Sequence, residues 1–125
     1  MKYPKHEDER GYFRELAKVS DLKYDIEQVS IFTINPSQTR GDHYHKKLIE
    51  TFIILEGECI VTTTTDFTRC NPDVMGYSHD KNLKEGDSVT FHPEVQHKFY
   101  SEKGCKILVL ADREFNPDEP DVYKY

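Results

Sequence analysis

Short runs of β-type residues, separated by turn residues, occupy most of this sequence and constrain its fold more than any other feature. Val, Ile, Thr, Phe and Tyr are frequent in several of these runs, and such side chains suit a pleated, half-buried surface. Hardly any stretch keeps a helical period over three turns, so the pattern predicts an all-β chain. The predicted strands are Tyr12–Lys18, Gln28–Asn35, Thr51–Leu55, Cys59–Thr65, Ser88–His92, Lys98–Ser101 and Lys106–Ala111.

The connections between these strands follow from the turn residues. Within the run ETFIILEGECIVTTTT, Glu56 and Gly57 separate two apolar segments, which predicts a hairpin with a tight turn at these two residues. The segment from Asp66 to Lys84 shows neither the helical nor the strand period, so we expect a long surface loop there. The tail from Glu114 combines two prolines with many acids and is predicted to be extended rather than helical.

Length and charge narrow the classes of function. The 125 residues are enough for one core, which predicts a single domain over residues 1–125 with its chemistry in one cavity. The net charge of -6 and the lack of a Lys or Arg stripe argue against nucleic acid and favour a small-molecule partner. No apolar run has the length of a signal peptide or membrane span, so we expect no membrane partner and a cytoplasmic location.

The three cysteines, Cys59, Cys70 and Cys105, lack the CxxC spacing of thiolate metal sites and redox pairs. We therefore expect buried or incidental thiols.

The motif RGDHYHKKLIE offers several side chains that could meet at one point. His43 and His45 are two residues apart, so on an extended strand both imidazoles project from the same face while Tyr44 points the other way. Glu50 lies at an odd offset from His45, so a turn or bulge in KKLI is needed before its carboxylate can face the same way.

A fourth candidate, His97, follows the next strand-turn-strand unit. Three imidazoles and one carboxylate suit a divalent metal, with zinc as our first choice and nickel, manganese or iron as alternatives. Coordination positions would remain for water or substrate. We expect the remaining histidines His6 and His79 to be ordinary surface residues.

These residues resemble the first cupin motif, in which His-x-His, four residues, Glu, six residues and Gly occur in order. His43, His45, Glu50 and Gly57 have that spacing. Gly86, Pro93 and His97 match the Gly, Pro and His of the second cupin motif. The chain departs from the two motifs at Glu94 and at Ser37, where glycines are usual. The resemblance implies a cupin fold, which is a double-stranded β-helix or jelly-roll-like barrel.

A finer resemblance runs from DERGYFRE through QVS, TRGDHYHKK and ETFIILEGE to FNPDEP. It is similar to the cupin domain at the C-terminus of capsular-polysaccharide reductases and, more distantly, to deoxysugar 3,5-epimerases and 3,4-ketoisomerases. This implies an epimerase or isomerase that acts on a 4-keto-deoxysugar linked to a nucleotide diphosphate, in surface-polysaccharide biosynthesis. We expect a separate reductase to supply any reduction. The alternatives are a metal-dependent small-molecule cupin, such as a dioxygenase, and a non-catalytic sugar-binding cupin.

The resemblance leaves two roles open for His43. In the ketoisomerases and 3,5-epimerases the first His of RGxH is understood as the catalytic base, and no metal is required. The ketoisomerases commonly have Gln where this chain has Glu50, which favours a metal here. If His43 is a ligand, the base must lie elsewhere.

Substrate contacts are expected beside the motif. The planar guanidinium of Arg40 suits the diphosphate of a nucleotide sugar, and His92 could line the cavity. We expect Lys46 and Lys47 to be solvated turn residues. A homodimer is expected because an open β-barrel leaves strand edges that pairing can cover.

Overall fold

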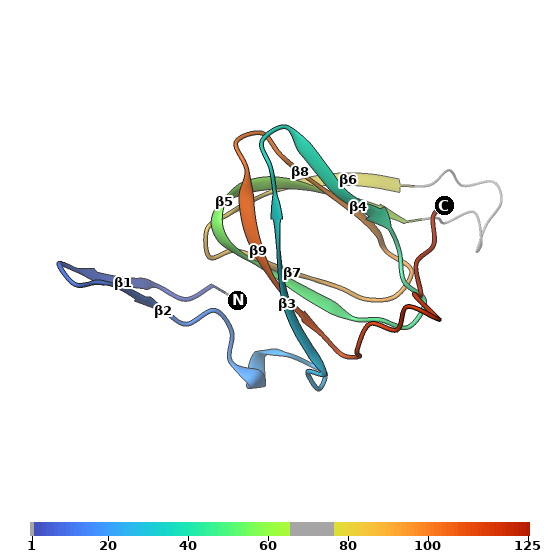
Figure 1. Cartoon of the computed structure of the whole chain (residues 1–125), viewed down its shortest axis with the longest axis horizontal. Helices are drawn as coiled ribbons and strands as arrows, with labels where there is room; N and C mark the ends of the chain where they lie inside the picture. Colours follow the sequence, from blue (N-terminus) through green and yellow to red (C-terminus); the bar gives the residue numbers. More distant parts are fainter. Residues whose placement is uncertain (1, 66–76) are drawn as a thin grey trace.

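The computed structural model describes residues 2–65 and 77–125, which form nine β-strands and one short 3-10 helix (Figure 1). The strands are β1 (Lys5–Asp8), β2 (Gly11–Arg14), β3 (Gln28–Ile34), β4 (Gln38–His43), β5 (Glu50–Thr65), β6 (Tyr77–Lys84), β7 (Ser88–Phe91), β8 (Gln96–Ser101) and β9 (Cys105–Ala111), and the helix η1 spans Val19–Asp21. The all-β prediction is confirmed. In this described part of the chain, no helix is long and apolar enough to cross a membrane.

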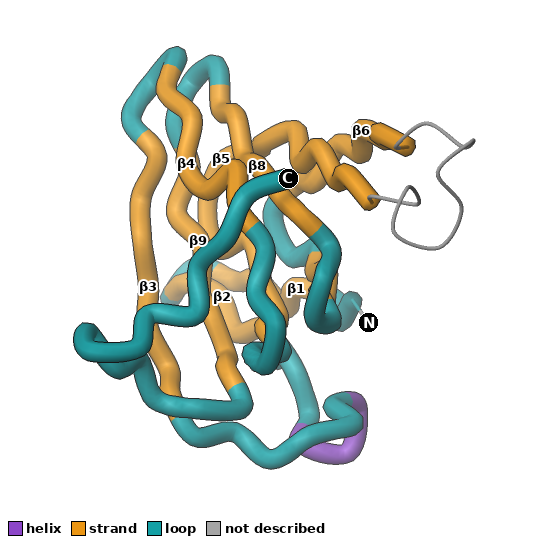
Figure 2. The backbone as a smooth tube through the Cα atoms, turned by 90° about the vertical axis from the view of Figure 1, so that its right-hand side faces the viewer, coloured by secondary structure: helices purple, strands orange, loops and turns teal. Residues whose placement is uncertain are grey.

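Seven of these strands form one curled antiparallel sheet, an open barrel (Figure 1, Figure 2) that curls around an apolar core. The strand order is β3-β9-β5-β8-β4, and β6 and β7 also pair with β5. β1 and β2 form a separate hairpin that projects from this barrel (Figure 1). The C-terminal tail runs back to the mouth of the barrel, where β4 ends (Figure 2).

β5 is a single strand of 16 residues, so the predicted hairpin at Glu56–Gly57 is wrong. Its first part pairs with β7 and β9, and its second part takes β6 and β8 as partners. The register against β9 shifts near Glu56, and Gly57 has a φ of 79°, so the strand bends but does not reverse. A Cβ at Gly57 would lie 2.4 Å from the carbonyl oxygen of Gly104, so only glycine fits this bend without movement of the backbone.

Other strand boundaries also differ from those predicted. The loop expected over 66–84 is wrong for Tyr77–Lys84, which forms β6, while residues 66–76 lie outside the described part. Most of β6 is polar and exposed, and its conformation comes from its pairing with β5, which no pattern in its own sequence reveals. The strand expected over Tyr12–Lys18 ends at Arg14, and β1 and β4 were not predicted. The tail from Glu114 contains no helix, as expected.

The core lies between the two layers of the curled sheet and is rich in aromatic rings. Phe52, Phe91 and Phe99 are buried and pack against each other with ring centroids 4.8 to 6.3 Å apart. The ring of His97 stacks on Phe91 at 4.4 Å with an interplanar angle of 4°, so one predicted site residue is packed into the edge of the core. Its position is therefore fixed by the same packing that stabilises the fold.

Cys59 and Cys105 are buried free thiols, in agreement with the prediction, and burial raises the pKa of Cys59 to about 12. Cys70 lies outside the described residues.

Candidate functional site

A bulge at the end of β4 directs His43 towards the barrel interior. The register between β4 and β8 shifts between Gly41 and His43, and Gly41 and Asp42 both have positive φ, of 91° and 68°. A Cβ on Gly41 would lie 2.9 Å from the carbonyl oxygen of His97, so glycine allows the close approach of the two strands. As a result His43 and His97 are cross-strand partners.

The four predicted ligand residues come together in space. His43, His45 and His97 each offer a ring nitrogen within 4.8 Å of the other two. An oxygen of Glu50 lies 2.9 Å from Nε2 of His45 and 3.7 Å from Nε2 of His97. The bend expected between His45 and Glu50 is present, and it allows the carboxylate to face the imidazoles.

Hydrogen bonds fix how two of the imidazoles are turned. Nδ1 of His45 lies 2.7 Å from the carbonyl oxygen of Asp121, and Nδ1 of His97 lies 3.1 Å from that of Val95. A carbonyl oxygen can only accept, so both Nδ1 atoms must carry a proton and donate it. In a neutral ring this leaves the lone pair on Nε2, the atom that faces Glu50.

The donor set fits a metal ion. Nε2 of His45 and Oε1 of Glu50 are buried, and within the described residues neither has a partner with hydrogen-bond geometry, although they are only 2.9 Å apart. Buried polar atoms of this kind are normally satisfied, and a divalent cation would satisfy both. Their assignment as ligands stays a prediction.

Burial and charge set the protonation of the cluster. Burial lowers the pKa of His97 to about 4, and burial together with the neighbouring His45 lowers the pKa of His43. Burial also acts on His45, but Glu50 and the carbonyl group of Asp121 outweigh it and raise the pKa of that ring. His43 and His97 are therefore neutral at neutral pH, as a metal ligand or a catalytic base requires.

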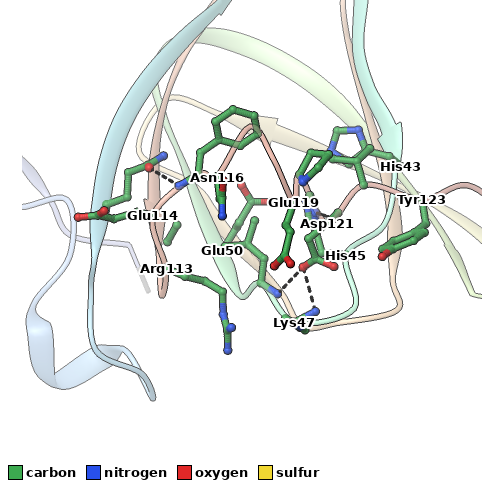
Figure 3. A pocket seen from close by; sticks show the side chains of 16 residues that line it. His43, His45, Lys47, Glu50, Arg113, Glu114, Asn116, Glu119, Asp121 and Tyr123 are labelled. Carbon is green, nitrogen blue, oxygen red and sulfur yellow. Dashed lines mark hydrogen bonds and ion pairs between the residues drawn. The ribbon is translucent and has the colours of Figure 1, made fainter.

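Two cavities meet at this cluster. One of about 210 Å³ lies inside the barrel and is bordered by Arg40, His43, Glu50 and His97 together with core phenylalanines. The other, of about 850 Å³, lies between the barrel and the C-terminal tail, and His43, His45 and Glu50 border it (Figure 3). Since His43 and Glu50 belong to both, a ligand in either cavity would reach the same two side chains.

The remaining predicted site residues differ in position. Arg40 is exposed, lines the cavity inside the barrel and has its guanidinium 5.5 Å from the centre of the Phe32 ring. His92 is exposed and lines neither cavity, so the structure does not bring it to the cluster. Lys46 and Lys47 are exposed, as expected, although Lys47 lies at the rim of the larger cavity.

Residues of the C-terminal tail also belong to this site, although no sequence pattern indicated them. Asp121, Tyr123 and Arg113 line the larger cavity (Figure 3), and Asp121 also contacts His45. The tail has turn residues but no periodic pattern, and a pattern of this kind does not tell which surface a segment covers.

Comparisons with known proteins relate nearly the whole chain to one group. The family model described as polysaccharide biosynthesis C-terminal domain matches residues 6–123. The UDP-2-acetamido-2,6-beta-L-arabino-hexul-4-ose reductase of Pseudomonas aeruginosa is 43% identical over 134 aligned residues, which cover 96% of this chain. They cover only 30% of the reductase, so the chain spans less than a third of that relative.

Two solved structures have a similar fold. A double mutant of the QdtA 3,4-ketoisomerase from Thermoanaerobacterium thermosaccharolyticum, in complex with TDP, is 27% identical with a TM-score of 0.75 and covers 99% of this chain and 84% of the ketoisomerase. The dTDP-4-dehydrorhamnose 3,5-epimerase from Sulfolobus tokodaii is 20% identical with a TM-score of 0.73 and covers 93% of this chain and 71% of the epimerase. The second likeness concerns the fold alone.

Proposed function

The chain belongs to the family of polysaccharide biosynthesis C-terminal domains and has the cupin fold, and from that premise we propose that it is a nucleotide-diphosphate-sugar epimerase or isomerase. Its substrate would be a 4-keto-deoxysugar of surface-polysaccharide biosynthesis. The observation that carries this proposal is the convergence of three imidazoles and Glu50 where two cavities meet. The names of the relatives support the substrate class, since they include a 3,4-ketoisomerase bound to TDP and a reductase of a UDP-linked ketosugar.

The chemistry needs a base that is neutral and reaches the sugar. The ketone of a 4-keto sugar acidifies the neighbouring C–H bonds, so removal of one proton gives an enolate that can be reprotonated elsewhere or from the other face. His43 meets the requirement because burial lowers the pKa of its ring and because it borders both cavities. We propose it as the catalytic base if it is not bound to a metal.

A divalent metal is the second part of the proposal. His43, His45, Glu50 and His97 would hold one ion, zinc by preference and nickel, manganese or iron as alternatives. Such an ion, when bound, polarises a ketone as a Lewis acid and stabilises the enolate charge. His43 would then serve as a ligand, and another side chain would have to take the proton.

The metal proposal has a direct test. Elemental analysis of the purified protein should find about one divalent metal per chain. The absence of metal, together with no thermal stabilisation by added zinc, nickel, manganese or iron, would contradict it and leave His43 as the base.

The sizes of the two cavities suggest where each part of the substrate binds. The larger one, about 850 Å³, is within the range of roughly 300 to 1,000 Å³ that is typical of ligand pockets, whereas the 210 Å³ cavity is too small for a whole nucleotide sugar. We infer that the sugar ring lies at His43, where the cavities meet. Arg40 borders the smaller cavity and is our candidate for binding the diphosphate, whereas His92 borders neither cavity and is not proposed as a contact.

Three further proposals concern partners and location. We propose a homodimer because β3 stands at the end of the sheet order and exposes Val29 and Ile31, which are 61% and 56% accessible. A separate reductase is proposed to use the product, in line with the activity named for the Pseudomonas relative. We also propose a cytoplasmic location.

A metal-dependent cupin of another class remains the second candidate, because three histidines and a glutamate would suit it equally. Thermal shift with nucleotide diphosphates and nucleotide sugars separates the two, since binding to the native state raises its stability. We expect stabilisation by at least one nucleotide sugar, and a weaker effect in an Arg40→Ala variant. If none of these ligands shifts the melting temperature, the dioxygenase-like or the non-catalytic reading would replace our proposal.

A further inference from the structure

The last five residues, Asp121 to Tyr125, complete the site as an added β-type segment. Beyond the end of β4, Tyr44 and Tyr123 form an antiparallel bridge through two backbone hydrogen bonds, of 2.8 and 3.0 Å. The ring of Tyr44 is buried, stacks on Tyr125 at 4.3 Å and lies 5.7 Å from the ring of Tyr123. Tyr44 stands between His43 and His45, so this segment packs directly behind the two imidazoles.

Asp121 ties this segment to the turn after His45. Its carboxylate accepts hydrogen bonds from the backbone N–H groups of Lys46, Lys47 and Leu48 at 3.0, 3.0 and 3.2 Å. These three residues form the turn that brings Glu50 round to face the imidazoles. Asp121 has a φ of 52°, a left-handed conformation that aspartate adopts more readily than most residues.

The backbone of Asp121 acts on His45 itself. Its carbonyl oxygen lies 2.7 Å from Nδ1 of His45 and can only accept, so it holds the proton on Nδ1. In the neutral ring Nε2 then carries the lone pair, 2.9 Å from an oxygen of Glu50, whereas the protonated ring, which this carboxylate favours, carries a proton on both nitrogens. The carboxylate and the carbonyl group of one residue thus fix both the turn and the tautomer.

We propose that Asp121 is a positioning residue: it holds His45 in the Nδ1–H tautomer with Nε2 directed at Glu50, and so sets the geometry of the catalytic cluster. Its effect on catalysis rests on the proposed function, whereas the tautomer does not. The carbonyl group that holds the tautomer belongs to the backbone and is present in every variant, so the side chain acts on His45 by anchoring that carbonyl group to the turn after His45. If the carboxylate stabilised the turn without anchoring the carbonyl group, its removal would leave the imidazole tautomer unchanged.

The experiment compares three variants with the wild type. Asp121→Gly removes the carboxylate but accepts the left-handed backbone. Asp121→Asn retains one oxygen, which can accept the two bonds from Lys47 and Leu48, and loses only the bond from Lys46. Asp118→Gly is the matched control, because Asp118 is an exposed acid of the same tail that lines neither cavity.

The main readout is the tautomer of His45, measured by long-range ¹H–¹⁵N correlation in chelator-treated protein with ¹⁵N-labelled histidine at alkaline pH, where the ring is neutral. We expect the Nδ1–H form in the wild type, in Asp121→Asn and in Asp118→Gly, and a mixture with Nε2–H in Asp121→Gly. For exchange on a 4-keto nucleotide sugar, Asp121→Gly should lose kcat by about 10- to 100-fold with little change in KM, a loss typical of residues behind a ligand.

Two results would overturn the proposal. One is a wild-type His45 that carries its proton on Nε2. This measurement needs no variant, so it tests the proposal even if Asp121→Gly does not fold. The other is a folded Asp121→Gly that keeps the pure Nδ1–H form. A tautomer change in Asp121→Gly without any exchange by the wild type would instead support the role of Asp121 and refute the proposed function.

Discussion

The metal-free protein should lose stability in acid because of His97. In the unfolded chain an imidazole has an ordinary pKa of 6.5, whereas burial lowers the pKa of His97 in the folded protein to about 4. As the pH falls from 6.5 towards 4, the unfolded chain binds a proton that the folded protein does not accept, so the free energy of unfolding falls. The displacement of the pKa corresponds to about 3 kcal/mol at most.

The other two rings of the cluster modify this profile. His43 also has a lowered pKa, so it adds to the loss, whereas His45 has a raised pKa and stabilises the folded state at low pH. The carboxyl groups of Asp and Glu side chains also titrate in acid and change the free energy of unfolding. Only a comparison of variants therefore isolates the contribution of His97.

Urea unfolding at a series of pH values, with a chelator present, measures the effect. Between neutral pH and pH 4 the wild type should lose about 2 to 3 kcal/mol more than a His97→Gln variant, which has no imidazole at this position. His92→Gln, which removes an exposed histidine, is the control and should follow the wild type. Parallel profiles for the wild type and His97→Gln would refute the argument that burial keeps this ring neutral.

Three further predictions concern the backbone and the assembly. Gly57→Ala should lower the free energy of unfolding by about 2 kcal/mol or more, because its Cβ would meet the carbonyl oxygen of Gly104. Gly11 also has a positive φ but lies in open space, so Gly11→Ala should lower it by less. Equal losses for the two variants in urea unfolding would contradict this. Glu94→Gly should raise stability by up to about 1 kcal/mol, since Glu94 has a φ of 77°, and a lower melting temperature would be the opposite outcome. Light scattering should give the mass of a dimer, and a monomer at micromolar concentration would disprove it.

Much of the cluster could be predicted because its residues are close in the sequence. The two-residue period of a strand placed His43 and His45 on one face, and the odd offset of Glu50 implied the turn that the structure contains. At the two departures from the cupin motifs, Glu94 and Ser37 adopt the positive φ that glycine takes most readily, 77° and 63°.

Other features depend on contacts that no local pattern records. Gly57 signalled an irregularity correctly, but whether β5 bends or reverses there is decided by its pairing with β7 and β9 in its first part and with β6 and β8 in its second. β6 is a strand because β5 offers it a partner, and its polar residues show no strand period of their own. Asp121 reaches His45 across 76 positions of the chain, so its role could not be read from the sequence.

Deuterium wash-in tests the central claim most directly. The wild-type protein is incubated in deuterated water with a series of 4-keto nucleotide sugars, and mass spectrometry detects deuterium at the carbon beside the ketone. We predict incorporation for at least one sugar, and a loss on the order of 10²- to 10⁴-fold in His43→Asn. Loss of exchange with unchanged thermal stability would identify His43 as the base, and loss of metal and stability together would identify it as a ligand. No wash-in by the wild type with any of these sugars would contradict the assignment as an epimerase or isomerase.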